Sequence, residues 1–501
     1  MDSSFSSSLA ATNATTTNTT SSPPTSSTFS PPSSLLIIGS GVFGLGTAWA
    51  LSRRPAFSNC SITVVDRSDP NTNVFPASDA ASVDTSRIVR ADYADPAYAA
   101  LGAEAQVLWR QQTSPTDLGA CGRYHESGLL LVADGVPPPP NTPPRPAIID
   151  KTKLTGMDYA RYSWANVLQL AAQNPALAGQ VRETPDVAAI RAEARTGGGS
   201  SGAWGYINDG SGWADAGASM AWLYQQVKQT GRVTFVAGTV TSLEHKGSAV
   251  TGAKLSDGRV LSADLVMLAA GAWTASLLDI SGQAVATGQV LGYLDITEAE
   301  QAQLSNMPTI LNLSSGLFII PPRNRVLKIA RHAYGYLNPT VPQTEPLPQS
   351  PSAAATFKCD SQQSVSLPLT SASDPTLSIP AEGAEDLRAA LREMVPLPAL
   401  WDRPFTKTRL CWYSDTPTGD FVVDYHPQWQ NLFVAFGDSG HAFKFMPVIG
   451  DKTADCIMKS CPPEFKGKWH WKPANSSTVV TEDGTRGGKP GLILAEALAQ
   501  R

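Results

Sequence analysis

Cysteine is scarce in this sequence, with six residues among 501. None of the six belongs to a C-x-x-C pair, and none stands at a metal-ligand spacing from the six histidines. The spacing therefore predicts no metal site and argues against a disulfide framework. Such sparse use of cysteine suits a reducing compartment, in which thiols stay free or become attached to a cofactor.

The sequence also lacks long hydrophobic runs and an excess of positive charge. No apolar run approaches the roughly 20 residues that a membrane-spanning helix needs. The net charge of -5 and the pI near 5.7 argue against nucleic acid or an anionic membrane as the main partner. With 42% hydrophobic residues, the chain can instead bury one large core or two medium ones.

Neither end of the sequence resembles a targeting signal. Residues 1–34 are mostly Ser, Thr, Ala and Pro, so we expect a disordered tail. This tail lacks the basic start and apolar core of a signal peptide, and it lacks the arginines of a mitochondrial presequence. Residues Glu496–Arg501 are not a peroxisomal address of the Ser-Lys-Leu type. We therefore expect a cytoplasmic protein.

Against these absences stands a glycine motif near the N-terminus. Four apolar residues, Leu35–Ile38, predict a buried strand, and Gly39, Gly41 and Gly44 follow it as G-x-G-x-x-G. A helical run and a second apolar strand come next, and that strand ends in Asp66, where the partner of a ribose hydroxyl is expected. The motif predicts a dinucleotide site, because glycines let the backbone approach a pyrophosphate at the helix N-terminus. The residues expected to contact the dinucleotide here are Gly39, Gly41, Val42, Phe43, Gly44, Asp66 and Arg67.

A second informative segment runs from Arg409 to Gly450. A lone cysteine, Cys411, stands among polar and aromatic residues, and the apolar run Asn431–Phe436 then leads into a glycine-containing turn. A buried strand that delivers small and charged residues to a helix start is typical of a redox cofactor site. The residues expected to contact the cofactor here are Cys411, Gly437, Asp438, Ser439, Gly440 and Lys444.

The order of elements predicts an α/β fold with two domains. A helix is expected at Asp215–Gln229, followed by alternating strands and by another buried strand within Asp264–Trp273. The alternating strands are expected at Val233–Ala237, Val250–Ser256 and Val260–Leu261. We assign residues 35–95, 205–284 and 410–460 to a discontinuous Rossmann-type domain. Residues 96–204 and 285–409 are assigned to a substrate domain with a mixed antiparallel sheet and a flexible insertion at about 338–375, and residues 461–501 to a C-terminal extension.

These motifs resemble the amine-oxidising flavoenzymes typified by monomeric sarcosine oxidase. They are most similar to the fungal branch that holds fructosyl amino acid, saccharopine and pipecolate oxidases. The resemblance covers roughly residues 35–460 and rests on the glycine motif, Ser86–Arg90, Val326–His332 and Cys411–Lys444. It implies that the dinucleotide is FAD, and that Cys411 carries it through a thioether to the isoalloxazine 8-methyl group. From the residues alone, Cys411 could equally be a small buried hydrophobic residue.

The resemblance also implies catalytic roles for Lys328, Arg87, His332 and Tyr413. Lys328 is expected to lie over the flavin, where a fixed positive charge stabilises superoxide as it forms. The alternative is an exposed lysine on a strand. Arg87 is expected near the flavin edge. His332 and Tyr413 are expected to line the substrate pocket, or else to be core residues with satisfied hydrogen bonds.

Arg90 and Lys444 are implied to hold the carboxylate of the substrate. An arginine can grip a carboxylate through two parallel hydrogen bonds, which fixes orientation as well as charge. The alternative for the two arginines of this motif is a surface ion pair, for instance with Asp84 or Asp92. The role of Asp438 stays open, although an apolar run ending in Gly-Asp also resembles the ribityl-binding turn of other FAD proteins.

The predicted function is a flavin-dependent oxidase of an amino acid with a secondary amine, of the saccharopine, pipecolate, fructosyl or N-methyl type. The products are an imine and hydrogen peroxide from O2, and the family implies a monomer. A first alternative is a specialised oxidase of N-alkyl amino acids in secondary metabolism, whose imine is trapped in ring formation. A second is an NAD(P)-dependent dehydrogenase, supported only by the glycine motif. A third is a non-catalytic flavin-binding protein whose tail recruits partners.

Overall fold

The computed structural model describes residues 29–68, 76–139, 142, 154–352, 364–473, 476 and 478–500. The residues from Pro31 onward form one unit. Strand β1 begins at Ser34, the last residue of the predicted tail, and residues 1–28 of that tail lie outside the described residues. Within the described residues, no helix is both long enough and apolar enough to cross a lipid bilayer.

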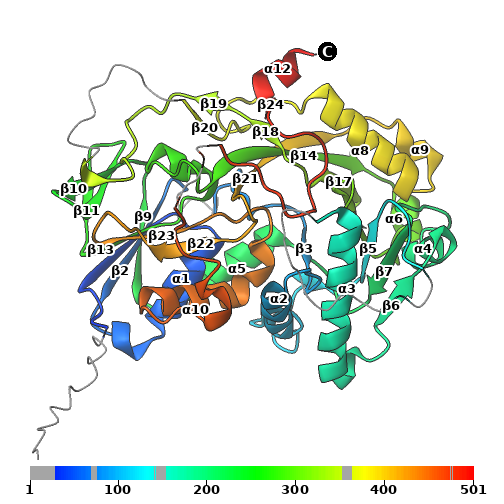
Figure 1. Ribbon diagram of the computed structural model, residues 1–501, viewed down its shortest axis with the longest axis horizontal. Coiled ribbons are helices and arrows are strands. Elements are labelled where there is room, and N and C mark those ends of the chain that lie inside the picture. The colour runs from blue at the N-terminus through cyan, green and yellow to red at the C-terminus, as the bar shows by residue number, and fades with distance from the viewer. Residues whose placement is uncertain are drawn as a thin grey trace, which may run out of the picture. The chain divides into compact units, whose positions relative to one another are not determined.

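A six-stranded sheet carries the glycine motif near its middle (Figure 1). In spatial order its strands are β22 (Val422–Tyr425), β23 (Leu432–Phe436), β13 (Leu265–Leu268), β1 (Ser34–Ile38), β2 (Ser61–Asp66) and β9 (Val233–Ala237). All neighbouring pairs are parallel except β22 and β23. The central strands of a parallel sheet are covered on both faces, which explains why β13 and β23 are continuous buried apolar runs.

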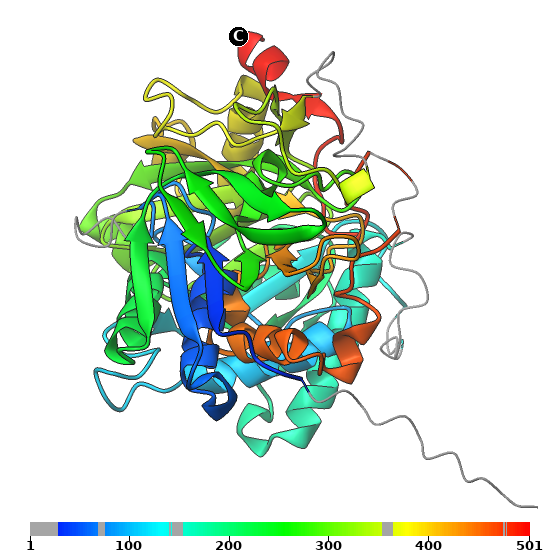
Figure 2. The ribbon, with the colours of Figure 1, turned by 90° about the vertical axis from the view of Figure 1, so that its left-hand side faces the viewer.

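Three helices cover one face of this sheet, and a small sheet covers the other. The helices are α1 (Val42–Ser52), α5 (Ala216–Gln229) and α10 (Met446–Ile457). Helices α1 and α10 approach closely, because a Cβ added at Gly450 would lie 2.0 Å from the carbonyl oxygen of Gly46. The small antiparallel sheet consists of β10 (Val240–Lys246), β11 (Ala249–Leu255) and β12 (Val260–Ser262) (Figure 2). Its Leu243 and Val250 belong to the same buried cluster as Leu36 of β1.

One prediction about these strands was wrong. Val233–Ala237 was expected to be the first of three alternating strands, but it forms β9 and extends the parallel sheet beside β2. The antiparallel set begins instead with β10, which the sequence analysis missed. A strand's partner depends on pairing with residues far along the chain, so a local pattern of alternation does not reveal it.

A second, ten-stranded sheet forms the other half of the unit. In spatial order its strands are β24 (Leu492–Ile493), β18 (Tyr336–Leu337), β14 (Val285–Asp295), β17 (Val326–Arg331), β16 (Leu317–Arg323), β15 (Thr309–Asn312), β5 (Leu129–Ala133), β7 (Trp204–Asn208) and β6 (Val181–Thr184), with β21 (Lys407–Asp415) paired to β14. Most neighbours are antiparallel, whereas β5 and β15 are parallel, as are β18 and β24. The predicted mixed antiparallel sheet is therefore confirmed.

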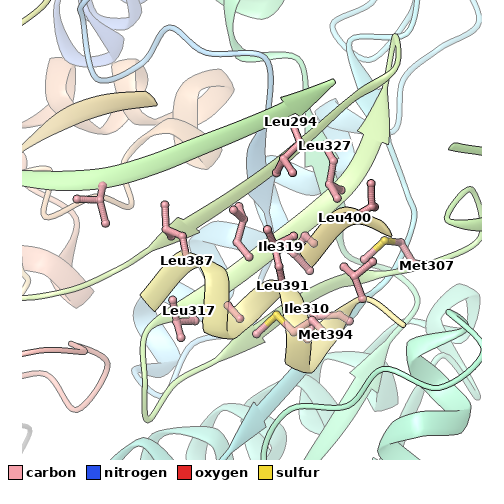
Figure 3. Packing of buried hydrophobic residues seen from close by; sticks show 14 of the residues in the cluster. Leu294, Met307, Ile310, Leu317, Ile319, Leu327, Leu387, Leu391, Met394 and Leu400 are labelled. Carbon is pink, nitrogen blue, oxygen red and sulfur yellow. The ribbon is translucent and has the colours of Figure 1, made fainter. Parts of the chain in front are cut away.

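Helix α8 (Ala381–Met394) packs across β14, β16 and β17 (Figure 3). Leu387, Leu391 and Met394 are fully buried on one side of this helix. Their spacing of four and three residues places them on one stripe, which is the helical pattern expected for a core-facing surface. They belong to one buried cluster with apolar side chains of the sheet, among them Ile319 and Leu327.

A small three-stranded sheet joins the two large ones. It consists of β3 (Arg87–Val89), β8 (Gly212–Ala214) and β4 (Tyr124–His125), and β3 pairs with β8. Helix α2 (Pro96–Trp109) follows β3, and the Asp95 side chain caps it by accepting a hydrogen bond from the backbone N–H of Ala97. The other elements are α3 (Gly156–Gln173), α4 (Val187–Ala194), α6 (Glu298–Gln303), α9 (Pro398–Trp401), α11 (Pro463–Lys466), α12 (Leu494–Ala499), β19 (Pro339–Thr340) and β20 (Val365–Ser366).

The strand pairing departs from the predicted domain boundaries in three places. Strands β7 and β21 were grouped with the nucleotide-binding pieces, but both pair within the large mixed sheet. Strand β24 of the predicted C-terminal extension also joins that sheet. Within the predicted insertion, β19 and β20 pair with each other, and residues 353–363 lie outside the described residues. The remaining boundaries stay a prediction.

Candidate active site

The glycine motif forms a turn between β1 and α1 that is open on one side. Gly39 has φ +102°, and a Cβ added there would lie 2.4 Å from the carbonyl oxygen of Ala269. A Cβ at Gly44 would lie 1.9 Å from the carbonyl oxygen of Gly39. At Gly41, by contrast, no heavy atom lies within 4 Å of an added Cβ. Gly39 and Gly44 thus allow close packing, and Gly41 leaves the approach to the N-terminus of α1 clear, as a pyrophosphate requires.

Asp66 and Arg67, at the end of β2, lie beside this turn. Asp66 Oδ2 accepts hydrogen bonds from the backbone N–H and the hydroxyl of Ser40, both at 2.7 Å. Arg67 forms a bidentate ion pair with Asp79, and its Cζ lies 4.2 Å from the ring centroid of Trp273. Both side chains line the cavity described next, so they can contact a ligand there, and a ribose contact by Asp66 stays a prediction.

A cavity of about 250 Å³ extends from this turn to the opposite end of the chain. It is lined by the predicted residues Gly39, Gly41, Val42, Phe43, Asp66, Arg67, Arg87, Tyr413, Asp438 and Gly440. A second cavity of about 80 Å³ adjoins it, and the two share Arg87, Tyr413, Gly440 and Phe443. The second cavity is lined by the predicted residues Arg87, Arg90, His332, Cys411, Tyr413, Gly440 and Lys444. Residues from both ends of the sequence therefore meet around one continuous space.

Cys411 lies on β21 at the wall of the second cavity. Its residue is 2% exposed, and its Sγ accepts a hydrogen bond of 3.2 Å from Nη2 of Arg87. Arg87 also forms an ion pair with Asp84. Burial opposes the charge of Arg87, but Asp84 outweighs it and raises the pKa of the guanidinium. A permanent cation therefore stands beside the only cysteine that lines these cavities among the described residues.

Lys328 lies behind Arg87, in an ion pair with the same carboxylate. Its Nζ is 2.6 Å from Oδ2 of Asp84 and donates a hydrogen bond of 2.6 Å to the carbonyl oxygen of Ser86. Burial lowers the pKa of Lys328 to about 8, although Asp84 partly opposes this shift. Burial would raise the pKa of Asp84, but Lys328 and Arg87 hold it well below its usual range. The alternative of an exposed strand lysine is wrong, because Lys328 is 3% exposed, yet it does not line either of the two cavities.

Arg90 and Lys444 differ from this group because neither forms an ion pair with a carboxylate among the described residues, although Asp92 helps to raise the pKa of Arg90. Both are buried and both line the second cavity. Among the described residues, Nη1 of Arg90 has no hydrogen-bond partner, and Nζ of Lys444 donates only to the carbonyl oxygen of His441, at 2.9 Å. Burial and the neighbouring Arg90 lower the pKa of Lys444 well below its usual value. Two buried basic groups without a paired carboxylate indicate a site that an anion completes, and such an anion would favour the charged form of Lys444.

The predicted alternative of surface ion pairs holds for neither arginine. Asp84 does pair with Arg87, but the Asp84 side chain is only 3% exposed and that of Arg87 17%, so this is not a surface pair. Asp92 accepts hydrogen bonds from Asn208 at 3.0 Å and from Ser211 at 2.6 Å. Arg90 is therefore left with its orphan nitrogen at the second cavity.

His332 and Tyr413 stand side by side on the wall of the second cavity, with ring centroids 5.7 Å apart. Nε2 of His332 is 3.2 Å from the hydroxyl of Thr485. Burial, with Arg486 and Arg90 nearby, lowers the pKa of His332 well below its usual value, so the imidazole is neutral. Burial, reinforced by Cys411, raises the pKa of Tyr413, so its hydroxyl keeps its proton.

The turn Gly437–Gly440 is fastened to β21 by Asp438. Its carboxylate accepts hydrogen bonds from the backbone N–H groups of Ser414, at 3.0 Å, and Gly440, at 3.2 Å. Burial raises the pKa of Asp438 to about 6. A Cβ at Gly440 would lie 2.3 Å from Cε2 of Tyr413, so this turn fits only without a side chain there. The hydroxyl of Ser439 accepts a hydrogen bond of 3.2 Å from the backbone N–H of Thr416, just after β21, and Ser439 does not line the first cavity, so its cofactor contact stays a prediction.

Sequence reasoning missed three site residues in the C-terminal extension: Asp483, Thr485 and Arg486. Arg486 is almost fully buried and pairs with Asp415 at 2.8 Å, beside Tyr413. Thr485 lines the second cavity, and it borders a third cavity of about 50 Å³ together with Asp483. No local motif surrounds these residues, so only the path of the chain reveals their position.

The amino-acid sequence matches the family described as FAD dependent oxidoreductase over residues 34–456. The amino acid oxidase imqH of Aspergillus flavus is 32% identical over 469 residues, covering 85% of this chain and 93% of that protein. The L-saccharopine oxidase of Schizosaccharomyces pombe is 28% identical over 465 residues, covering 89% and 94%. In structure, the chain is similar to the fructosamine oxidase (Amadoriase II) of Aspergillus fumigatus, with a TM-score of 0.69, 26% identity, and coverage of 92% and 95%.

The comparisons decide between the alternatives that the sequence left open. The matched family uses FAD, so the NAD(P)-dependent dehydrogenase that rested on the glycine motif alone is not supported. The relatives are oxidases matched over almost their full length, which likewise favours an enzyme over a non-catalytic binding protein. The predicted resemblance is confirmed. This chain belongs to the FAD dependent oxidoreductase family and is a flavin-dependent amino acid oxidase.

Proposed function

We propose that this oxidase acts on an amino acid with a secondary amine, and that Arg90 and Lys444 hold the carboxylate of that substrate. The single observation behind this proposal is the pair of buried cations that share the second cavity without a neutralising carboxylate among the described residues. A substrate carboxylate supplies the missing charge. It also supplies an acceptor for the orphan nitrogen of Arg90.

The first cavity fits FAD. The turn is open at Gly41, the N-terminus of α1 faces it, and Asp66 stands at the end of the neighbouring strand. We propose that Cys411 carries the flavin covalently, since Arg87 places positive charge beside the sulfur and a thiolate is the nucleophilic form of cysteine. When bound, FAD supplies the acceptor for two electrons from the amine, which it then passes to O2, giving hydrogen peroxide.

The same cations prepare the amine for oxidation. The nitrogen must carry a lone pair while the C–N bond gains double-bond character, so an ammonium cannot react. Arg90 and Lys444 disfavour a further positive charge nearby and thereby lower the pKa of the bound amine. Holding the carboxylate also fixes which C–H bond of the substrate faces the first cavity.

The shape of the second cavity favours one kind of substrate within this class. Besides the polar residues and Gly440, its wall consists of apolar side chains: Ile88, Leu291, Leu311, Leu313, Phe318, Ala330 and Phe443. Within the described residues, no acidic side chain lines it. An N-alkyl amino acid with an apolar side chain fits such a wall better than a fructosyl polyol. This supports the second candidate function, an oxidase of N-alkyl amino acids whose imine is trapped in ring formation.

A panel of amines tests the proposal. Purified FAD-loaded protein should release hydrogen peroxide with secondary-amine amino acids, and fastest with N-methyl amino acids that carry apolar side chains. Pipecolate, saccharopine, sarcosine and a fructosyl amino acid complete the panel, and the decarboxylated analogue of the best substrate is the matched control. Activity that is equal with and without the carboxylate would contradict the role of Arg90 and Lys444.

Mass spectrometry tests the covalent link separately. The peptide that contains Cys411 should carry the mass of FAD, and Cys411→Ala should release all flavin on acid precipitation. Cys456→Ala, at another buried cysteine, is the matched control and should keep the adduct. An unmodified Cys411 peptide in yellow wild-type protein would reject the link and leave the oxidase function standing.

A further inference from the structure

The C-terminal strap, which we define as residues 481–487, enters the active site from beyond the end of the family match at residue 456. The strap contacts the backbone of the residue that follows β17. The N–H of Gly487 donates a hydrogen bond of 3.0 Å to the carbonyl oxygen of His332. At the other end of the strap, the hydroxyl of Thr481 donates to the carbonyl oxygen of Thr416 at 2.8 Å. The strap is therefore held at both ends, and Thr485 is held between them.

The hydrogen bonds along the strap have only one possible direction. The hydroxyl of Thr485 is 2.6 Å from Oδ1 of Asp483, and a carboxylate can only accept, so the hydroxyl donates to it. A hydroxyl has one hydrogen. Toward Nε2 of His332, at 3.2 Å, the same oxygen must therefore accept. It follows that Nε2 of His332 carries the proton of the neutral imidazole, and that Nδ1 carries the lone pair.

Nδ1 of His332 is free to accept a hydrogen bond from a ligand. Within the described residues it has no partner, and the imidazole borders both the second and the third cavity. His441, the other histidine at these cavities, has no such freedom. Its Nε2 is 2.7 Å from the carbonyl oxygen of Gly419 and its Nδ1 is 3.1 Å from the hydroxyl of Tyr93, so both ring nitrogens are occupied.

The surroundings of His332 favour the departure of a proton from the site. The charged and titratable groups around the ring are Arg90, Tyr413, His441, Lys444, Asp483 and Arg486. The cations among them oppose any added positive charge at the cavity. Asp483 is the only carboxylate linked to the ring through hydrogen bonds among the described residues, and its side chain is 17% exposed, which gives it contact with water.

We propose that His332, Thr485 and Asp483 form a proton relay that takes the proton of the substrate ammonium to solvent. This proposal rests on the proposed function. The N–H bond of the ammonium breaks and an Nδ1–H bond forms on His332, while the Nε2 proton moves to Thr485 and the hydroxyl proton of Thr485 moves to Asp483. Asp483 releases that proton to water.

The ring returns to its first tautomer when Nδ1 gives its proton to water in the emptied cavity and Nε2 regains one through Thr485. No electron is transferred in these steps, and the net change is one proton from the amine to solvent.

Three variants on the strap test the relay. Thr485→Val keeps the shape but removes the hydroxyl, and Thr485→Ser restores the hydroxyl. Thr481→Val removes a hydroxyl from the same strap that has no part in the relay, so it controls for loosening of the strap. In this design Thr485 is a positioning residue, and a merely structural role would affect Thr481→Val and Thr485→Val alike.

The first measurement needs no substrate. ¹⁵N NMR of FAD-loaded, histidine-labelled protein, with the His332 signal assigned through His332→Asn, should show the Nε2–H tautomer in the wild type, in Thr485→Ser and in Thr481→Val. Thr485→Val should lose that preference. An Nδ1–H tautomer in the wild type, or an unchanged tautomer in Thr485→Val, would overturn the relay.

The second measurement follows the flavin absorbance under anaerobic conditions with N-methyl-L-phenylalanine as the probe. We expect Thr485→Val to reduce the flavin about ten-fold more slowly than the wild type near pH 7. The difference should vanish near pH 10, where the free amine is already abundant. Equal pH profiles for the two proteins would overturn the relay and leave the proposed function standing. No flavin reduction and no peroxide with any amine of the panel would instead reject the proposed function and the relay with it.

Discussion

Two pairs of basic side chains, each made of an arginine and a lysine, differ in how their charge is balanced. Arg87 and Lys328 share the carboxylate of Asp84. Arg90 and Lys444 share a cavity and have no carboxylate partner among the described residues. The first pair is complete without a ligand, whereas the second pair is complete only with one. The balance of charge, rather than the presence of an arginine and a lysine, therefore distinguishes the supporting group from the binding group.

The largest effect is expected when the carboxylate that Arg87 and Lys328 share is removed. Asp84→Asn leaves Arg87 and Lys328 buried without an anion, and we expect the free energy of unfolding to fall by about 3–5 kcal/mol. Urea denaturation of FAD-loaded protein measures this change. Asp84→Asn combined with Lys328→Met should recover part of the loss, because only one cation then stays uncompensated.

Asp257→Asn is the matched control for that measurement. Asp257 pairs with Arg259 on the surface, at 2.7 Å and with both side chains about half exposed. Water screens such a pair, so we expect no measurable change in unfolding. If Asp84→Asn were as mild as this control, the balanced pair would not be what supports the site.

For Arg90 and Lys444, which have no carboxylate partner among the described residues, we expect a substitution to lower activity rather than stability. Arg90→Gln should lower kcat/KM for a carboxylate-bearing substrate by about 100-fold to 1000-fold, because a buried charge-assisted grip is lost. The free energy of unfolding should stay the same or rise, since a buried charge without a partner is removed. Steady-state peroxide release and urea denaturation measure the two effects. A variant that loses stability but not activity would place Arg90 in the supporting group.

Lys328→Met separates the two pairs kinetically. The resemblance to the sarcosine oxidase family implies that Lys328 stands near the flavin, where its charge would stabilise negative charge on reduced oxygen, so we expect reaction of the reduced enzyme with O2 to slow by about 100-fold. Flavin reduction by the amine should change by less than two-fold in rate, because Lys328 does not line the substrate cavity. Stopped-flow spectroscopy resolves the two half-reactions. If Lys328→Met slowed flavin reduction by the amine and left the reaction with O2 unchanged, Lys328 would act in the reaction of the substrate and not in that of O2.

The smallest effect concerns the pH dependence of stability. The pKa of Lys328 is lowered to about 8 in the folded protein, whereas an unfolded lysine titrates near 10.4. Between these two values the unfolded state binds more protons, so stability should rise with pH in this window, by at most about 1.4 kcal/mol per pH unit. Urea denaturation from pH 8 to 10.5 should show this slope in the wild type and a flatter one in Lys328→Met. Equal slopes in the two proteins would mean that burial does not lower the pKa of Lys328 in the folded protein.

The motifs of the sequence were sufficient to find many of the residues that line the two cavities. The glycines, Cys411, Arg90 and Lys444 stand in short patterns whose spacing reflects local chemistry, and all of these patterns line the two adjoining cavities. Asp84 was named only as a possible surface partner, because its burial depends on Lys328, which lies 244 positions away. Asp483 and Thr485 could not be found at all, since nothing around them differs from an ordinary polar loop.

By itself, the sequence determined the glycine turn, the buried parallel strands and the cationic residues of the site, because backbone conformation and hydrophobic pattern are local properties. The tertiary structure decided which strands pair, which cations are neutralised, and that the C-terminal strap reaches His332. Those outcomes depend on contacts between distant residues. Burial and electrostatic balance arise only when such residues are brought together, and no short stretch of sequence contains them.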